Sequence, residues 1–141
     1  MRIVLDVNVW ISGLLWVGVP GRIFDLASAH QITIFVSEPI GEDIKEILER
    51  KKLQAKIQSL DVTVEDLLAV VRQLSESCST EAVDVPELRD PDDIVILETA
   101  LAANAEVIIT GDLDLLVLNE FNGIQILIPQ VFLSRYFPDM L

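Results

Sequence analysis

The N-terminal stretch MRIVLDVNVWISG (residues 1–13) is a strongly apolar run with two polar side chains near its middle. Residues 2–5 have the composition of a short strand that is buried on both faces, and Asp6 and Asn8 follow it. An acid inside an apolar core is costly unless it has a partner. We therefore expect Asp6 to stand where the chain leaves a buried strand, at the edge of a sheet.

Further apolar runs of the same kind, separated by amphipathic helical patterns, occupy most of the chain. The strand-like runs are 32–36, 106–110 and 124–128, and the helical patterns are 21–29, 38–52, 64–75, 91–104 and 130–137. Strands that alternate with helices on this scale predict an α/β fold with a mostly parallel sheet and helices on both faces. Residues 75–90 are typical of an extended loop, with room for a short edge strand.

Length and composition limit the domain organisation and the class of protein. The chain has 141 residues, of which 51% are hydrophobic, so we expect a single domain over 1–141. Cys78 is the only cysteine and His30 the only histidine, which excludes an internal disulfide and disfavours a zinc site. No apolar run is long enough for a membrane helix, and we expect a cytoplasmic protein without membrane partners.

Acids recur at the positions where strands are predicted to end. The formal net charge of −13 argues against a general polyanion binder, so these acids need another explanation. In VIITGDLDLL (107–116) a buried strand runs into Thr110, a glycine and Asp112. The first and fourth strands of such a sheet can be neighbours across its switch point, which would place Asp6 and Asp112 on one rim.

The segment LRDPDD (88–93) has two explanations. Asp90 can cap a helix that starts at Pro91, and further acids there favour the positive end of the helix dipole. At about 100° per residue, however, Asp93 stacks over the buried side of the helix, which Leu97, Ala100 and Asn104 define, with Asp90 flanking it and Asp92 turned further away. A buried acid at that position normally requires a partner.

The helix predicted at 38–52 offers further acids. Its core stripe consists of Ile40, Ile44, Ile47 and Leu48. Asp43 lies about 75° from the stripe centre and is the rim residue, while Glu46, at about 135°, is the alternative if the helix is rotated.

Asp6, Asp43, Asp93 and Asp112, with Asp90 nearby, thus come from four segments that can converge on one mouth of the sheet. Carboxylates at close range repel one another unless a cation compensates them. Their oxygens suit a hard divalent cation, Mg²⁺ or Mn²⁺. Such a site can activate water against a phosphate, so the residues point to phosphodiester hydrolysis.

Four motifs in this order resemble one known family: LDVNV (5–9), EPIGEDIKEIL (38–48), DPDD (90–93) and TGDLDLL (110–116). They resemble the PIN domain, and most closely the VapC-like toxin components of toxin–antitoxin systems. The resemblance implies a three-layer α/β/α fold, with about five strands, and a metal-dependent ribonuclease. It also implies a homodimer that acts on RNA and is partnered by a small antitoxin.

The resemblance also implies residue roles. Asp6, Asp43, Asp93 and Asp112 match the family's acids, and Asp6, Asp93 and Asp112 would hold the Mg²⁺ or Mn²⁺. The family commonly has Glu where Asp43 stands, so Glu46 remains an alternative. The supporting positions are Asn8, Asp90, Thr110, as an orienting hydroxyl, and Asp114.

Other interpretations of the same residues stay open. The basic cluster Arg50, Lys51, Lys52 and Lys56 fits either RNA binding or cations at the end of a helix. Trp10 and the apolar residues 14–17 fit a buried first helix better than an interface. A haloacid-dehalogenase-like phosphatase or a response-regulator receiver would need a late lysine, and none follows Lys56. An inactive PIN module that binds proteins is the remaining alternative.

Overall fold

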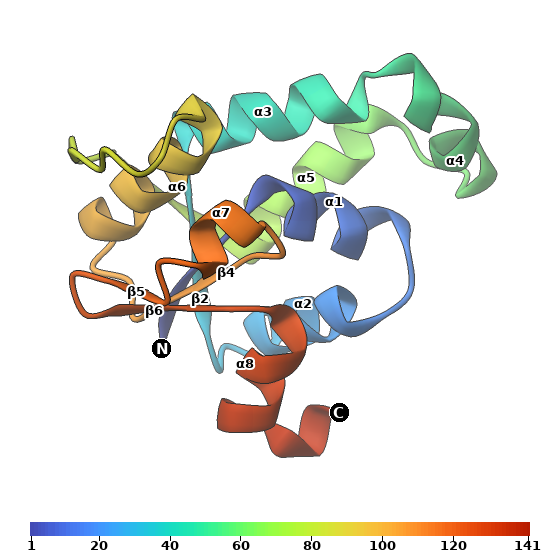
Figure 1. Cartoon of the computed structure of the whole chain (residues 1–141). Helices are drawn as coiled ribbons and strands as arrows, with labels where there is room; N and C mark the ends of the chain where they lie inside the picture. The colour runs from blue at the N-terminus through green and yellow to red at the C-terminus, as the bar shows by residue number, and fades with distance from the viewer.

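Strand β1 (Arg2–Leu5) lies in the middle of a six-stranded sheet, between β2 and β4 (Figure 1). A computed structural model describes residues 1–141. The strand order is β3-β2-β1-β4-β6-β5, and all neighbours are parallel except β5 and β6. The remaining strands are β2 (Thr33–Ser37), β3 (Ser75–Cys78), β4 (Val107–Ile109), β5 (Glu120–Phe121) and β6 (Ile124–Leu127).

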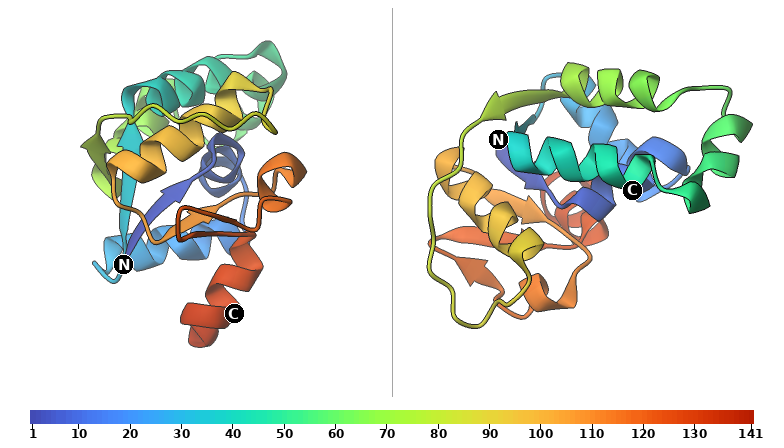
Figure 2. Two further views of the ribbon diagram at one scale, coloured as in Figure 1. Left: turned by 60° about the vertical axis from the view of Figure 1, so that its left-hand side comes forward. Right: turned by 90° about the horizontal axis from the view of Figure 1, so that it is seen from above.

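Helices cover both faces of this sheet, which confirms the predicted α/β class. In two views α3 and α6 lie above the sheet, and α2 and α8 lie below it (Figures 1 and 2). The helices are α1 (Val7–Leu15), α2 (Val19–Ser28), α3 (Glu38–Leu48), α4 (Gln54–Ser59), α5 (Val64–Leu74), α6 (Pro91–Ala102), α7 (Leu113–Leu116) and α8 (Pro129–Tyr136). Two short 3₁₀ helices, η1 (Lys51–Leu53) and η2 (Pro138–Met140), complete the chain.

The helix expected at 38–52 is shorter than predicted. Helix α3 ends at Leu48, Arg50 is extended, and the chain continues as η1 and α4. Residues 49–52 offer no apolar side chain to extend the buried stripe, so packing does not favour a longer helix. The side-chain amide of Gln54 donates to the carbonyls of Leu48 and Arg50 and stabilises the break.

The helix expected at 91–104 also ends early, at Ala102. Asn104 takes a left-handed conformation, with a φ of 51°, which is a common way for a helix to end. Its side chain is exposed, so its predicted place on the buried helix face was wrong. The side-chain Nε of Arg2 donates to the carbonyl of Ala103, which ties this end of the helix to β1.

The sheet has one more strand than the five or so expected. Strands β5 and β6 form a hairpin whose turn residues, Asn122 and Gly123, have φ angles of 50° and 82°. Asn-Gly is the favoured pair for such a turn because both positions need a positive φ. At the opposite edge, β3 occupies the start of the stretch where the sequence allowed a short edge strand.

The first helix divides the apolar residues 10–17 between the core and the surface. Trp10 is fully buried and packs against Phe24, with ring centroids 5.2 Å apart. Leu15 is also buried, as the core explanation expects. Trp16, however, is 48% exposed and Val17 is fully exposed. The core explanation therefore holds for the helix and not for the loop after it.

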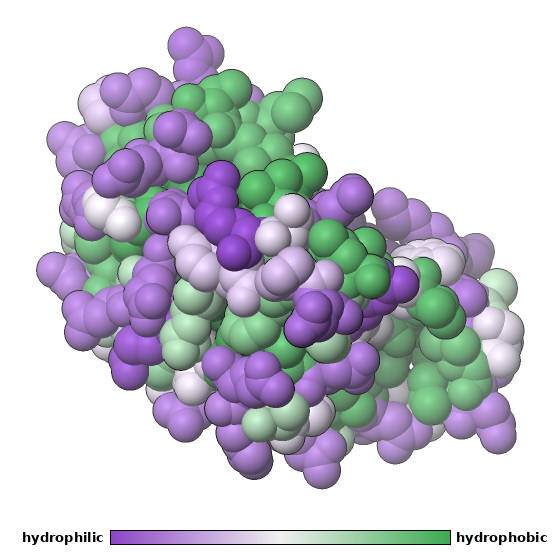
Figure 3. Space-filling view, turned by 90° about the horizontal axis from the view of Figure 1, so that it is seen from below, coloured by the Kyte–Doolittle hydropathy of each residue, from purple (hydrophilic) through white to green (hydrophobic).

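On the face that carries α2 and α8, apolar side chains lie in patches separated by hydrophilic ones (Figure 3). No single helix has the length and apolar composition of a membrane span; α1 and α2 meet the test only as a pair, which is bent by 92°.

Candidate functional site

Two acids meet at one edge of the sheet because β1 and β4 are parallel neighbours. Leu5 pairs with Ile109, and the backbone N–H of Asp6 donates to the carbonyl of Ile109 (2.9 Å). Asp6 then caps α1, and Asp112, three residues after β4, caps α7. The predicted adjacency of the first and fourth strands is thus confirmed.

Thr110 connects these two acids. Its hydroxyl donates to Oδ2 of Asp6 (2.6 Å) and accepts from the backbone N–H of Asp112 (2.9 Å). The other oxygen of Asp6 accepts from the backbone N–H of Val7 (2.7 Å). Because Thr110 is fully buried, its hydroxyl holds the carboxylate of Asp6 and the backbone at Asp112 in fixed positions.

Helix α6 brings the third acid. Asp90 caps the helix by accepting from the backbone N–H of Asp92 (2.9 Å), and Pro91 occupies the first turn. Asp93 is only 4% exposed and lies on the face that Leu97 and Ala100 bury. Both explanations of this motif therefore hold, because Asp90 caps the helix and Asp93 is the buried acid.

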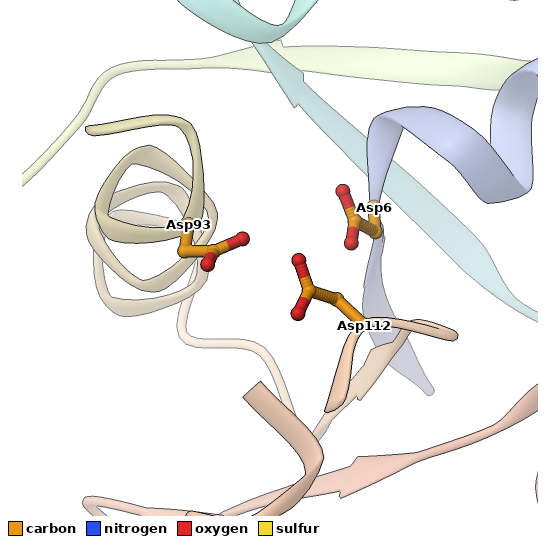
Figure 4. A group of neighbouring side chains, drawn as sticks. All are labelled: Asp6, Asp93 and Asp112. Atoms are coloured by element: carbon orange, nitrogen blue, oxygen red, sulfur yellow. The ribbon is translucent and has the colours of Figure 1, made fainter. Parts of the chain in front are cut away.

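Asp6, Asp93 and Asp112 point toward one another (Figure 4). One carboxylate oxygen from each lies within 4.8 Å of the other two. No basic side chain takes part in this cluster. Three convergent carboxylates are the donor set that a hard divalent cation such as Mg²⁺ or Mn²⁺ prefers, so these residues fit such an ion.

The electrostatics of the cluster are those of crowded, partly buried acids. Burial, followed by the neighbouring Asp112, raises the pKa of Asp93 to about 7. Burial also raises the pKa of Asp6, although its hydrogen bonds from Thr110 and Val7 act in the opposite direction. Without a cation the cluster holds a proton that a lone surface carboxylate would release.

An outer ring of polar side chains surrounds the cluster in a hollow of about 170 Å³. The predicted residues that line it are Asn8, Asp43, Glu46, Asp90 and Arg50, together with the three clustered acids. Asp43 is partly buried, whereas Glu46 is exposed and forms an ion pair with Arg50 (3.4 Å). This difference favours Asp43 over Glu46 as the helix acid.

Asp92 also lines the hollow, although the helical wheel turned it away from the site. Its charge is, after burial, the largest influence that raises the pKa of Asp43. The helical wheel compares Asp92 only with the buried side of its own helix, α6, and takes no account of α3, which lies on the other side of the hollow. The signal for it was present in the sequence as the first acid after Pro91.

The remaining predicted residues lie outside the hollow. Asp114 contributes its backbone N–H, which donates to the side chain of Asp112 (2.8 Å), while its own side chain is exposed. Lys51 and Lys52 are exposed on η1, and Lys56 lies on α4. Of the basic cluster, only Arg50 reaches the acids.

The fold and this cluster define an α/β protein with an acidic site at the carboxyl ends of its parallel strands, of the type that suits a divalent metal ion. Residues 2–114 match the family model described as PIN domain, and the chain belongs to that family. PIN domains are generally nucleases, and they typically bind divalent metal ions. No curated protein matches the chain.

Proposed function

We propose that this protein is a metal-dependent ribonuclease that hydrolyses RNA phosphodiester bonds at the acidic hollow. The observation that carries the proposal is the convergence of Asp6, Asp93 and Asp112, whose carboxylate oxygens lie within 4.8 Å of one another. Membership of the PIN family supports the same class of reaction. Asp6, Asp93 and Asp112 would hold Mg²⁺ or Mn²⁺, which supplies a Lewis acid and lowers the pKa of a bound water.

The chain's own residues prepare the site for that ion. The hydroxyl of Thr110 donates to the carboxylate of Asp6 and accepts from the backbone N–H of Asp112, so the two segments that bear these ligands are positioned before any ion arrives. Burial and the neighbouring Asp112 raise the pKa of Asp93 to about 7, and positive charge in the hollow would lower it again and favour release of the proton. Asp43 lies on the rim of the hollow, where it can orient the water that attacks phosphorus in line.

We infer further that residues 1–141 work as one PIN domain. The family match ends at residue 114, but β6 pairs with β4 inside the same sheet. Buried side chains from both sides of residue 114 form one continuous core. The C-terminal segment therefore supports the strand that positions Thr110 and Asp112.

The direct test is cleavage of labelled single-stranded RNA by the purified protein with Mn²⁺ or Mg²⁺. We expect cutting that EDTA abolishes and that Asp93→Asn abolishes while the protein stays folded by circular dichroism. Asp139→Asn is the matched control, because it removes an equal charge from an exposed position in η2. Folded wild-type protein that cuts none of several RNAs would instead favour an inactive, protein-binding PIN module.

We also propose the narrower role of a cytoplasmic, VapC-like toxin with a cognate antitoxin and a homodimeric state. Its support is the resemblance of the four acidic motifs. Induced expression should arrest bacterial growth, and Asp93→Asn should relieve the arrest at equal protein levels. Light scattering coupled to size-exclusion chromatography measures the oligomeric state. Arrest that persists in Asp93→Asn would contradict the toxin role as a nuclease.

A further inference from the structure

Positive charge is concentrated at one end of this acidic protein. Four of its ten basic residues lie within 50–56, in the segment that leaves α3 and forms η1 and α4. Arg50 pairs with Glu46, but Lys51, Lys52 and Lys56 have no acid within ion-pair distance. Figure 2, right, shows η1 and α4 at the end of the molecule away from α6. Unpaired lysines in a chain of net charge −13 form a local site of attraction for an anion.

An exposed indole lies against this segment. Trp16 follows the last residue of α1 and is 48% exposed, and Nζ of Lys56 lies 5.6 Å from the centroid of its ring. A hollow of about 350 Å³ adjoins the indole, where Gly18, Gly21 and Arg22 contribute to its wall. A large aromatic side chain left exposed beside the ammonium group of Lys56 presents a flat face on which a base can stack.

Helix α1 connects this indole to the acidic hollow. The helix starts at Asp6, and its exposed positions Asn8, Ser12 and Trp16 recur every four residues, so they follow one side of the helix. Asn8 and Arg50 both line the acidic hollow. The nine residues of α1 span about 14 Å, which is about four nucleotides of a stacked strand.

We propose that single-stranded RNA lies along this side of α1, from the acidic hollow to Trp16, with one base stacked on the indole and its phosphates contacted by the lysines of the 50–56 segment. This RNA track, defined by Asn8, Ser12, Trp16, Lys51, Lys52 and Lys56, rests on the proposed nuclease function. On this proposal a strongly acidic chain would bind a polyanion because the attraction is confined to one end of the molecule.

The stacking contact is tested by binding of a fluorescein-labelled single-stranded RNA of about twelve nucleotides, with Ca²⁺ present and the RNA checked as intact on a gel. Trp16→Leu keeps the apolar side chain and removes the aromatic face. We expect it to weaken binding about tenfold, and Trp16→Tyr to restore most of the loss. RNA should also quench the fluorescence of Trp16, since the only other tryptophan, Trp10, is buried.

The phosphate contacts are tested by the double variant Lys51→Gln/Lys52→Gln. We expect the slope of log affinity against log salt to decrease by about 1.5. The matched control is Arg72→Gln/Arg89→Gln, which changes the net charge equally at exposed positions outside the track. The control should keep the wild-type slope. An equal loss in both double variants would mean that only net charge matters and would overturn the track.

Failure of the track is distinguishable from failure of the nuclease function. Bis(p-nitrophenyl) phosphate is a substrate too small to reach Trp16, so its hydrolysis with Mn²⁺ measures the activity of the acidic site alone. Wild-type protein should hydrolyse it, and Asp93→Asn should not. RNA affinity tests the RNA track independently of cleavage. Wild-type affinity and an absence of quenching in the Trp16 experiments would overturn the proposal. So would conversion of a dimer to a monomer by Trp16→Leu at unchanged RNA affinity, because the indole would then belong to a protein interface.

Discussion

At the scale of single residues, Thr110 links the segments that carry two of the three clustered acids. One buried hydroxyl serves as donor to Asp6 and acceptor from the backbone of Asp112. The two acids follow strands that are far apart in sequence, and this side chain connects the carboxylate of one to the backbone of the other. Its loss would leave a buried acceptor on Asp6 and a partly buried donor on Asp112 without this partner.

Thr110→Val removes that hydroxyl at nearly constant volume. We expect the free energy of unfolding to fall by about 1–3 kcal/mol, because the unpaired groups stay buried. We also expect weaker Mn²⁺ binding, by about 10–100-fold, because an orienting group behind the ligands is lost. Chemical denaturation and calorimetric titration measure the two effects. Thr110→Ser keeps the hydroxyl and should retain most of both; a Thr110→Val protein with wild-type stability and affinity would contradict this role.

Asp93 should make the metal-free protein less stable as the pH rises. Burial raises its pKa from the ordinary value of 3.8 to about 7 in the folded state. Between these values the folded state retains a proton that the unfolded state has released, so stability falls as pH rises through this window. The full penalty, up to about 4 kcal/mol, is present above about pH 8.

Asp93→Asn removes this penalty. In EDTA we expect its melting temperature to exceed that of the wild type at about pH 8.5 by several degrees, and the difference to shrink toward pH 4. Thermal denaturation at both pH values measures this, with Asp139→Asn as the control for loss of one surface charge. A variant that melts below the wild type at high pH would show that the Asp93 carboxylate stabilises the fold.

At the scale of elements, the packing of α1 on α2 depends on a glycine, Gly13, which has no side chain. A Cβ on Gly13 would lie 2.5 Å from the ring of Phe24, which is itself packed against Trp10. On α2, a Cβ on Gly21 would meet no atom within 4 Å. The two glycines therefore have opposite consequences for substitution, although both lie within helices.

Gly13→Ala should lower the free energy of unfolding by about 1–3 kcal/mol, because the aromatic pair must shift to make room. Gly21→Ala should raise it by up to about 1 kcal/mol, because alanine favours the helix and nothing obstructs it. Urea denaturation of the two variants measures both changes. Equal effects would show that helix propensity alone, and not the contact with Phe24, decides the outcome.

Most elements were predictable from the sequence, because buried strands and amphipathic helices carry their own periodicity. The break after Leu48 was not, since it depends on hydrogen bonds from Gln54 rather than on any apolar pattern. The hairpin of β5 and β6 was missed although Asn122-Gly123 is a recognised turn signal. Its first strand has only two residues, too few to show alternation.

The candidate site was predictable as far as single elements and strand order determine it. Asp6, Asp93 and Asp112 converge because strand ends and one helix cap place them, and the sequence contains both signals. Asp92 was missed because its position in the hollow depends on how α6 faces α3. The exposure of Trp16 likewise depends on packing between α1, α2 and α4, which no single segment encodes.

At the scale of the whole molecule, cation binding should increase the free energy of unfolding. If Asp6, Asp93 and Asp112 hold one ion in the folded state only, Mn²⁺ at about 100 times its Kd stabilises the fold by about 2.7 kcal/mol, which raises the melting temperature by roughly 10 °C. NaCl at equal ionic strength is the control, since it only screens the net charge. EDTA should reverse the rise, and Asp93→Asn should lack it; an equal rise with NaCl would indicate screening alone.

The central position of β1 has a consequence for the order of events during synthesis. One of the two neighbours of this strand in the sheet, β4, is made about a hundred residues after it. Until then one edge of β1 has no partner, and Asp6 is separated from Asp112. Contacts between such distant segments form late in folding. A nascent chain thus cannot assemble its three-carboxylate cluster before the segment that carries Asp112 has been made.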